Sequence, residues 1–491
     1  MKKGAVVAVV AGLVIAYPAS SWVLGRQVHG YFEEEYQKLA DNSLIKVQDR
    51  KIESGVFESV ETVTFEFMPA LFGAMLNAKS EPADPAAPPP EPIRFTTRST
   101  IKHGPFPGLA AFGAGVVHTE LVLDNPRHPL LAKLYGDKTP LTIDTTVGFG
   151  GGGHQVMLSP AVDTTLEDNS HMSWGEIQLA SDFTRGMASY TMTGGAPFFK
   201  LASADGSTNV EVTALAIDGK QARLFEDNAS FYTGPVQFTV AKVDVRGPDG
   251  RGLSAEQLRF ASDTVSQGEF LDITASYGFQ SLKLDTENVG PSQLDIGLRH
   301  LHAKALADAQ KEYMNLIYGG KLVAAGNPPD LSLFKPLAKP FKTLLEGSPE
   351  FAIDKFEVQL PEGNIAAKVS VRLPNAKIGD LEAAAENPLV LMGLVSALET
   401  DGQIAVPEAL VLAATGEGKA AMIPAMIQEG YLINQNGTLS TTFKYATGQL
   451  VINGKKLDPS MFQTAAPAAA PAVGGEKPVK RAVPMAPISR K

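Results

Sequence analysis

The feature that most constrains this chain is an uncharged, apolar run close to the N-terminus, Gly4–Leu24. As an α-helix this run would measure roughly 30 Å, the thickness of the hydrocarbon core of a bilayer. It is apolar all round, whereas a helix buried in a soluble protein normally has a polar side. We therefore expect a transmembrane helix, with the rest of the chain on one side of the membrane.

The charges beside this run indicate its orientation. Lys2 and Lys3 precede it and Arg26 follows it, so the positive-inside rule favours a cytoplasmic N-terminus. The alternative is a cleaved signal peptide, which has a shorter apolar region and a small-residue cleavage site. The best such site is 19–21, Ala-Ser-Ser, with a tyrosine and a proline just before it. We therefore predict an uncleaved anchor.

Beyond the anchor, a helical pattern gives way to strands. Val28, Phe32 and Tyr36 have helical spacing, so we expect the anchor helix to continue with the acidic run 33–35 on its solvated side. From Val60 onward, polar and apolar residues alternate, as in a half-buried strand. Such runs recur between turn signals as far as residue 296 without intervening helices, which predicts an antiparallel meander.

The second half of the chain adds helices. Helical patterns occupy 302–317, 331–345, 381–398 and 408–428, and a hairpin pattern spans 351–373. The closing segment 430–457 contains Asn-Gly twice, which is the strongest two-residue signal for a tight turn, so we expect a β-meander there. The proline-rich segment 81–92 cannot pair as an internal strand and is expected to be an exposed insertion.

These patterns predict an α+β, β-rich fold, in which an N-terminal transmembrane helix is followed by an extended antiparallel β-meander sheet covered by a few helices. The expected units are the anchor (1–25), a β-rich region (26–300), an α+β region ending in a β-meander (301–462) and a disordered Ala/Pro-rich tail (463–491). A sheet of this kind leaves one face that needs a cover.

The composition argues against several classes of function. A net charge of −10 disfavours a general nucleic-acid-binding protein, which needs a basic surface to displace counterions from phosphates. The chain has 0 cysteines, which excludes disulfides, Cys-ligated zinc, iron–sulfur clusters and thiol nucleophiles.

The run Gly148–Gly153 matches the dinucleotide-binding pattern GxGxxG. That pattern binds a pyrophosphate only where a strand is followed by a helix, whose N-terminus holds the phosphates. Here a strand pattern follows and ends at Pro160, so we interpret the run as a β-hairpin loop. Neither a GxSxG nucleophile elbow nor a GxxxxGK[ST] phosphate loop occurs in the sequence.

The eight histidines form no familiar metal motif. His300 and His302 would share a face on a strand, where a two-histidine site is conceivable. His103 begins the turn sequence HGPFP and could act as a base. We interpret this segment instead as structural, with Phe106 buried and the histidine bonded to its own backbone. We expect no catalytic, cofactor-binding or metal-binding residues; the structural segment consists of His103, Gly104, Pro105, Phe106 and Pro107.

Several of these blocks together resemble the YdgA-like family of Gram-negative inner-membrane proteins. They are the anchor, the turn 55–57, HGPFP, the strand-to-helix passage Leu294–Tyr313 and the closing stretch 445–454, YATGQLVING. The resemblance covers nearly the whole chain, and only the insertion 81–92 and the basic tail depart from it. It implies a single-pass bacterial inner-membrane protein with most of its chain in the periplasm. Because the family is uncharacterised, the resemblance supplies no catalytic residues.

Two classes of function remain. The first is a non-enzymatic protein that binds lipid or envelope protein partners through an apolar groove or face, or acts as a scaffold, without metal, nucleotide or nucleic acid; a homo-oligomer is compatible with it. The second is a hydrolase of an envelope polymer, which would need paired carboxylates in a cleft. A large apolar groove would favour the first class, and a polar cleft with two close carboxylates the second.

Overall fold

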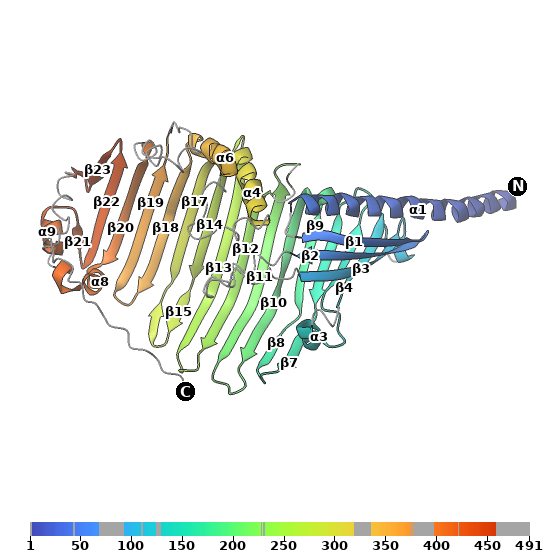
Figure 1. Ribbon diagram of the computed structural model, residues 1–491, viewed down its shortest axis with the longest axis horizontal. Coiled ribbons are helices and arrows are strands. Elements are labelled where there is room, and N and C mark those ends of the chain that lie inside the picture. The colour runs from blue at the N-terminus through green and yellow to red at the C-terminus, as the bar shows by residue number, and fades with distance from the viewer. Residues whose placement is uncertain are drawn as a thin grey trace, which may run out of the picture.

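The computed structural model describes residues 2–42, 45–67, 93–109, 111–123, 129–226, 228, 231–318, 335–374, 376, 397–420 and 422–457, with the side chains of the first helix described at 16–34, 36 and 37. These residues form one 24-stranded sheet, and a few helices lie against its ends and one edge (Figure 1). Every strand pair is antiparallel. The prediction of a β-rich fold built on a large antiparallel sheet is therefore confirmed.

The first element is a long helix, α1 (Lys2–Asn42), which continues well past the apolar run as the sequence pattern predicted. Among the described residues, no helix is long and apolar enough to cross a membrane. The expected span Gly4–Leu24 includes residues 4–15, whose side chains lie outside the description.

Successive strands pair mostly with the next strand in sequence, because alternating runs separated by short turns favour hairpins. The order along the sheet is β1-β2-β3-β4-β5-β6-β9-β10-β11-β12-β13-β14-β17-β18-β19-β20-β22-β23-β24. The remaining strands pair at the side: β7 with β8, β8 with β10, β15 with β13 and β16, and β21 with β22.

The first strands and short helices, together with the central strands of the meander, have the following bounds: β1 (Ile45–Ser54), β2 (Glu58–Phe67), β3 (Ile93–His103), η1 (Pro107–Leu109), β4 (Gly115–Val122), α3 (Pro129–Tyr135), β5 (Thr142–Val147), β6 (Gly153–Ser159), β7 (Val162–Thr165), β8 (His171–Trp174), β9 (Ile177–Phe183), η2 (Arg185–Met187), β10 (Ser189–Ala202), β11 (Asn209–Arg223), β12 (Tyr232–Arg246), β13 (Gly252–Gln267), β14 (Phe270–Phe279), β15 (Ser281–Leu284) and β16 (Glu287–Val289).

The C-terminal part of the sheet continues the same meander. Its elements are β17 (Ser292–His302), α4 (Ala303–Tyr318), α6 (Lys335–Glu346), β18 (Glu350–Leu360), β19 (Gly363–Arg372), β20 (Glu399–Pro407), α8 (Glu408–Ala420), α9 (Met422–Gln428), β21 (Ile433–Gln435), β22 (Thr438–Ala446), β23 (Gln449–Ile452) and β24 (Lys455–Lys456). Strand β17 crosses residue 300 and pairs with strands on both sides, so the sheet is continuous from the β-rich region into the α+β region.

Helices α4 and α6 match two of the expected helical patterns and pack together at one edge of the sheet (Figure 1). Their contact is a cluster of small and branched side chains, whose helical spacing was visible in the sequence. This buried cluster consists of Ala305, Ala309, Leu316, Leu337 and Leu344. The expected helix 381–398 lies almost wholly outside the described residues, and the insertion 81–92 and the tail 463–491 lie outside them entirely.

The tight turns also agree with the sequence. In both Asn-Gly turns the two residues have positive φ, for example 52° at Asn436 and 80° at Gly437, as the favoured hairpin turn requires. The glycine run lies between β5 and β6, where the Gly148 amide donates to the Gly152 carbonyl at 2.7 Å. A strand follows this run, so its interpretation as a hairpin loop is confirmed.

Candidate functional site: an apolar face of the sheet

The most extensive candidate site is one face of the sheet. Residues that are paired across neighbouring strands point to the same face, so the register can be followed from strand to strand. One such row crosses the sheet from β5 to β20, and nearly all its members are apolar. This row, the apolar track, consists of Ile143, Met157, Leu179, Gly194, Ile217, Phe238, Phe260, Tyr277, Leu294, Phe356, Ala367 and Ile404.

Two neighbouring rows on the same face widen this surface over the C-terminal strands. The first contains Val236, Ala275, Ile296, Ile353, Val369 and Phe443, with Ser262 and Gly402 between them. The second contains Ile273, Leu298, Phe351, Val371 and Tyr445, with Thr400 between the last two. The surface is therefore an apolar face several residues wide.

Large side chains of this face remain partly accessible. Tyr277 is 45% exposed, Phe351 42% and Phe238 39%. Extended apolar surfaces that stay accessible usually mark interaction sites, because their exposure to water costs free energy. The face is thus suited to an apolar ligand that runs across many strands.

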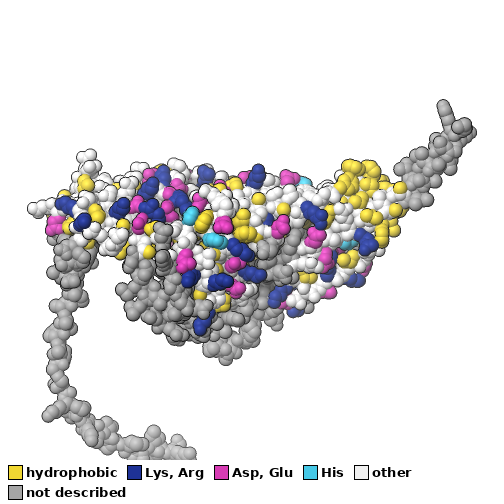
Figure 2. Space-filling view, turned by 90° about the horizontal axis from the view of Figure 1, so that it is seen from above, with side chains coloured by type: hydrophobic (Ala, Val, Ile, Leu, Met, Phe, Trp, Pro, Cys, Tyr) yellow, Lys and Arg dark blue, Asp and Glu magenta, His cyan; other side chains and the backbone are white. Residues whose placement is uncertain are grey.

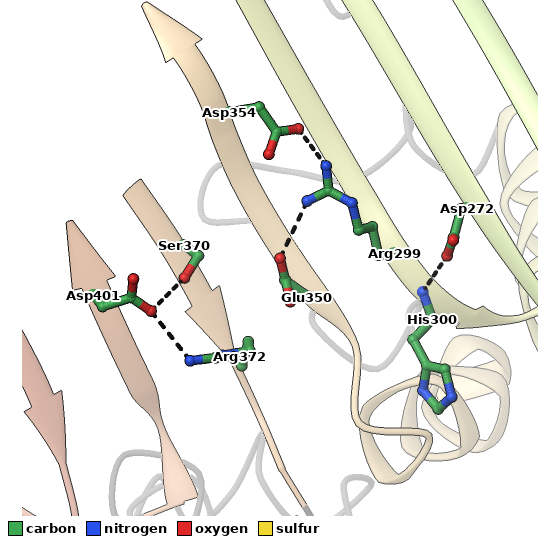
Figure 3. Close-up of polar contacts among 8 residues, drawn as sticks. All are labelled: Asp272, Arg299, His300, Glu350, Asp354, Ser370, Arg372 and Asp401. Atoms are coloured by element: carbon green, nitrogen blue, oxygen red, sulfur yellow. Dashed lines mark hydrogen bonds and ion pairs between the residues drawn. The ribbon is translucent and has the colours of Figure 1, made fainter. Parts of the chain in front are cut away.

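The opposite face is polar and bears networks of ion pairs and hydrogen bonds (Figure 3). Arg299 on β17 pairs with Glu350 at 3.1 Å and also with Asp354 on β18. Asp401 on β20 accepts hydrogen bonds from Ser370 at 2.7 Å and Arg372 at 3.1 Å. The two faces therefore differ in the way expected of a sheet with one solvated side.

Helix α1 covers the N-terminal end of the apolar face. Val28 is fully buried and packs with Ile101 and Val117, which are paired neighbours on β3 and β4. Gly25 lies so close to the His103 ring that an added Cβ would be 2.5 Å from it. Helix α1 therefore packs closely against β3 and β4, on the same face of the sheet that carries the apolar track.

A buried charged cluster joins α1 to β1 and β2. Glu61 is 0% exposed and forms an ion pair with Arg50, which also pairs with Glu33 of α1. Burial raises the pKa of Glu61, and the Arg50 guanidinium opposes this shift. Burial and the Glu61 carboxylate together raise the pKa of Tyr36, whose ring lies 4.9 Å from the Arg50 guanidinium carbon.

The acidic run of α1 is therefore only partly a solvated side. Glu33 pairs with Arg50, and Glu34 pairs with Arg185 at 3.1 Å. Arg185 also stacks over the ring of Tyr31. These contacts attach the helix to both β1 and the β9–β10 connection.

His103 has a structural environment, although not the one predicted. It is 3% exposed at the end of β3, and its Nδ1 lies 2.9 Å from the Val56 carbonyl. A carbonyl only accepts, so Nδ1 carries the proton and Nε2 accepts from the Ser59 hydroxyl at 2.9 Å in the neutral ring. The histidine therefore fastens the β1–β2 turn instead of bonding to its own backbone.

The prediction that Phe106 is buried is wrong. Its side chain is 48% exposed, whereas Gly104 and Pro107 of the same segment are buried and Pro105 is partly buried. The turn meets α1 through its backbone, because the Ser21 hydroxyl donates to the Gly104 carbonyl at 2.5 Å and the Tyr17 hydroxyl donates to the Phe106 carbonyl at 3.1 Å. The aromatic ring consequently points outward.

His29, His300 and His302 also have contacts within the protein. His29 of α1 lies beside His103, and burial, followed by the charges of His103 and Arg50, lowers its pKa. The His300 ring bonds to the Gly347 carbonyl at 2.6 Å, and His302 accepts from the Ala305 amide at the start of α4. In the described part of the chain, no group of three or more His, Cys, Asp or Glu residues could hold a metal ion.

A polar cavity of about 650 Å³ lies where β11 begins, β12 ends and β13 begins. Its carboxylates are already bonded within the protein. Glu211 pairs with Lys200 at 2.9 Å, Asp244 with Lys242 at 2.7 Å, and Asp285 accepts from the Gly252 amide. The cavity therefore does not present a pair of close, unbonded carboxylates to a substrate.

Comparison with known proteins agrees with the resemblance seen in the sequence motifs. A family model described as a bacterial protein of unknown function (DUF945) matches residues 1–460. Protein YdgA of Escherichia coli (strain K12) is 23% identical over 499 residues, covering 92% of this chain and 94% of YdgA. No solved structure matches the chain significantly.

Proposed function

The chain belongs to the DUF945 family of bacterial proteins of unknown function, and from this premise we propose that it is a lipid-binding protein of the bacterial inner membrane. In this proposal Gly4–Leu24 anchors the chain, the sheet lies in the periplasm, and acyl chains bind along the apolar track. The anchor holds the sheet close to its ligand, which raises the effective concentration of lipid.

The observation that carries the proposal is the length of the apolar track. Neighbouring strands are about 4.8 Å apart, so the row from Ile143 to Ile404 is roughly 50 Å long. A bilayer core is about 30 Å thick, so the acyl chains of one leaflet extend about 15 Å. The track is therefore long enough for the chains of more than one lipid.

The chemistry of the face favours acyl chains over a folded protein partner. The binding energy of an acyl chain comes from transfer of methylene groups out of water, about 0.8 kcal/mol for each one fully buried. This interaction needs no partner for a hydrogen bond, and the track offers almost no polar side chains to make one. A protein scaffold remains an outcome that the experiment below would reveal.

The hydrolase alternative gains less support from the described residues. The cavity of about 650 Å³ has its carboxylates bonded to lysines and a backbone amide, whereas a glycosidase needs two carboxyl groups that face the substrate. The Ser59–His103 pair is also buried, since the two residues are 1% and 3% exposed, so a polymer could not reach it.

Photo-crosslinking tests this proposal at neighbouring residues on opposite faces. A benzoylphenylalanine at Phe260 faces the track, and one at Arg259 faces the polar side, because adjacent strand residues alternate. On irradiation of cells that make the full-length chain, we expect a phospholipid adduct at position 260 and none at position 259. Adducts to protein only, or equal lipid adducts at both positions, would refute lipid binding by this face.

A further inference from the structure

A second exposed apolar surface lies where α1 leaves the sheet. It is formed by Trp22, Phe57, Phe106, Leu109, Phe112 and Phe149, which we call the aromatic collar. Leu109 is 86% exposed, Phe112 70% and Phe57 50%. Figure 2 shows hydrophobic side chains gathered at this end of the molecule, whereas charges of both signs are mixed over the rest of that view.

The topology explains why these residues meet. The connections 55–57, 104–114 and 148–152 all join strands at the same end of the antiparallel sheet. None of the three sequences contains a charged residue. Uncharged loops that expose large apolar side chains are unusual on a water-facing surface, where turns are normally polar.

The collar rings contact one another and still remain open to the outside. The Phe106 and Phe112 rings lie 5.3 Å apart between centroids, and those of Phe112 and Phe149 lie 5.1 Å apart. The apolar shape is therefore held by mutual packing, which keeps its conformational entropy cost on binding low.

The apolar run of helix α1 lies against the loops that form the collar. The Tyr17 hydroxyl donates to the Phe106 carbonyl at 3.1 Å, and the Tyr17 ring stacks on Phe57 at 5.7 Å. Ser21 bonds to Gly104, and further along the helix the Gln27 amide donates to the Phe149 carbonyl at 3.2 Å. The last turns of Gly4–Leu24 thus lie at the same level as the collar.

We propose that the aromatic collar is embedded in the outer leaflet of the membrane that holds α1. The segment from Tyr17 to Leu24 rises about 10 Å along the helix axis, so an apolar run that crosses the hydrocarbon core brings the collar beside it into the leaflet. The inference rests on the membrane anchor of the proposed function, but it does not require lipid binding by the apolar track.

The surroundings of the collar fit a lipid surface rather than a second copy of the chain. Trp22 lies beneath the Arg26 guanidinium, 5.0 Å from the ring, and the Lys102 side chain extends toward Gly108 in the collar loop. Aromatic rings edged by basic groups are typical of the interface between acyl chains and phosphates. Acidic residues also lie near this margin: Glu58 is paired with Lys102 in the register, and Glu53 pairs with Lys51.

Site-directed spin labelling tests the collar, because the natural chain has 0 cysteines. Phe112→Cys places a nitroxide in the collar, and Val122→Cys places one at the opposite end of β4, where the side chain is 43% exposed. Both substitutions alter exposed side chains, so the fold is retained. The full-length protein is reconstituted in vesicles of phosphatidylethanolamine and phosphatidylglycerol, and vesicle flotation confirms its insertion.

Each label's relaxation is measured with oxygen and with a water-soluble nickel chelate. We expect the ratio of the oxygen effect to the chelate effect to be severalfold higher for the label at 112 than for the label at 122. If the protein floats with vesicles and the label at 112 is as accessible to the chelate as that at 122, the collar proposal is wrong while the anchor stands. If the protein does not float, the anchor is wrong and the collar falls with it. Neither outcome depends on lipid adducts at position 260.

Discussion

Replacing Phe238 by aspartate is expected to lower the yield of the lipid adduct at position 260 by about tenfold, because a loss of about 1.4 kcal/mol in binding suffices for that factor. Phe238 and Phe260 are cross-strand neighbours on the apolar track. A carboxylate placed against acyl chains would lose its hydration without gaining a partner, which costs more than this minimum. Phe238 is 39% exposed, so the substitution removes little core packing.

The matched control is Gln237→Asp, one residue away on the polar face. The Gln237 side chain accepts from Arg259 at 3.2 Å, and an aspartate would keep an interaction with that guanidinium. We expect the adduct yield at position 260 to be unchanged in this variant. A similar decrease in both variants would show that added charge, and not the apolar track, controls the yield.

The second large effect is expected on stability. Arg50→Met should lower the free energy of unfolding by about 3–5 kcal/mol, which is typical when a buried ion pair loses one partner. Glu61 would remain with no cationic partner at 0% exposure, and Glu33 of α1 would lose its contact with β1. Thermal and urea unfolding of the full-length chain measure this change.

Lys51→Met provides the control, because Lys51 is the neighbouring residue and pairs with Glu53 in water, with side chains 71% and 66% exposed. We expect a change within about 0.5 kcal/mol for this variant. The double variant Arg50→Met, Glu61→Leu should recover most of the lost stability, since no uncompensated charge remains buried. Equal effects of Arg50→Met and Lys51→Met would contradict the role assigned to the buried pair.

The sequence predicts local elements of this protein well. The period of two marks the strands, helical spacing marks α4, and both Asn-Gly turns occur where a hairpin was expected. These features depend on residues close together in the chain, so a local pattern is sufficient to indicate them.

The apolar track could not be predicted because it depends on register. Which residue of β14 lies beside which residue of β17 is decided by irregularities such as that between Leu271 and Ile273. A shift of one residue would turn a side chain to the other face. In the sequence, polar and apolar residues alternate along the expected strands, which indicates that the sheet has an apolar face. This pattern does not show that the apolar residues of so many strands align in one row.

The position of Phe106 was mispredicted for a related reason. A phenylalanine between two prolines indicates a rigid turn, but the sequence does not reveal which side of the turn meets α1. The Phe106 ring contacts Phe112 of its own connection, and Phe112 in turn contacts Phe149 of the β5–β6 connection. Three uncharged loops meet at one end of the sheet, which indicates an exposed apolar surface there. This can be recognised only when the strand order is known.

The central claim is that acyl chains lie on the apolar track far from the membrane, and fluorescence quenching at Phe356 tests it most directly. At about 4.8 Å per strand, Phe356 lies roughly 40 Å along the row from Ile143, beyond the reach of a bilayer at the collar. In a chain whose Trp22 and Trp174 are changed to Phe, Phe356→Trp supplies a single reporter on the track, and Glu357→Trp supplies one on the polar face.

With vesicles of phospholipid brominated in the acyl chains, we predict that the tryptophan at 356 is quenched and that the tryptophan at 357 is not. If bromine quenches neither tryptophan, or quenches both equally, the claim that the track binds lipid is contradicted.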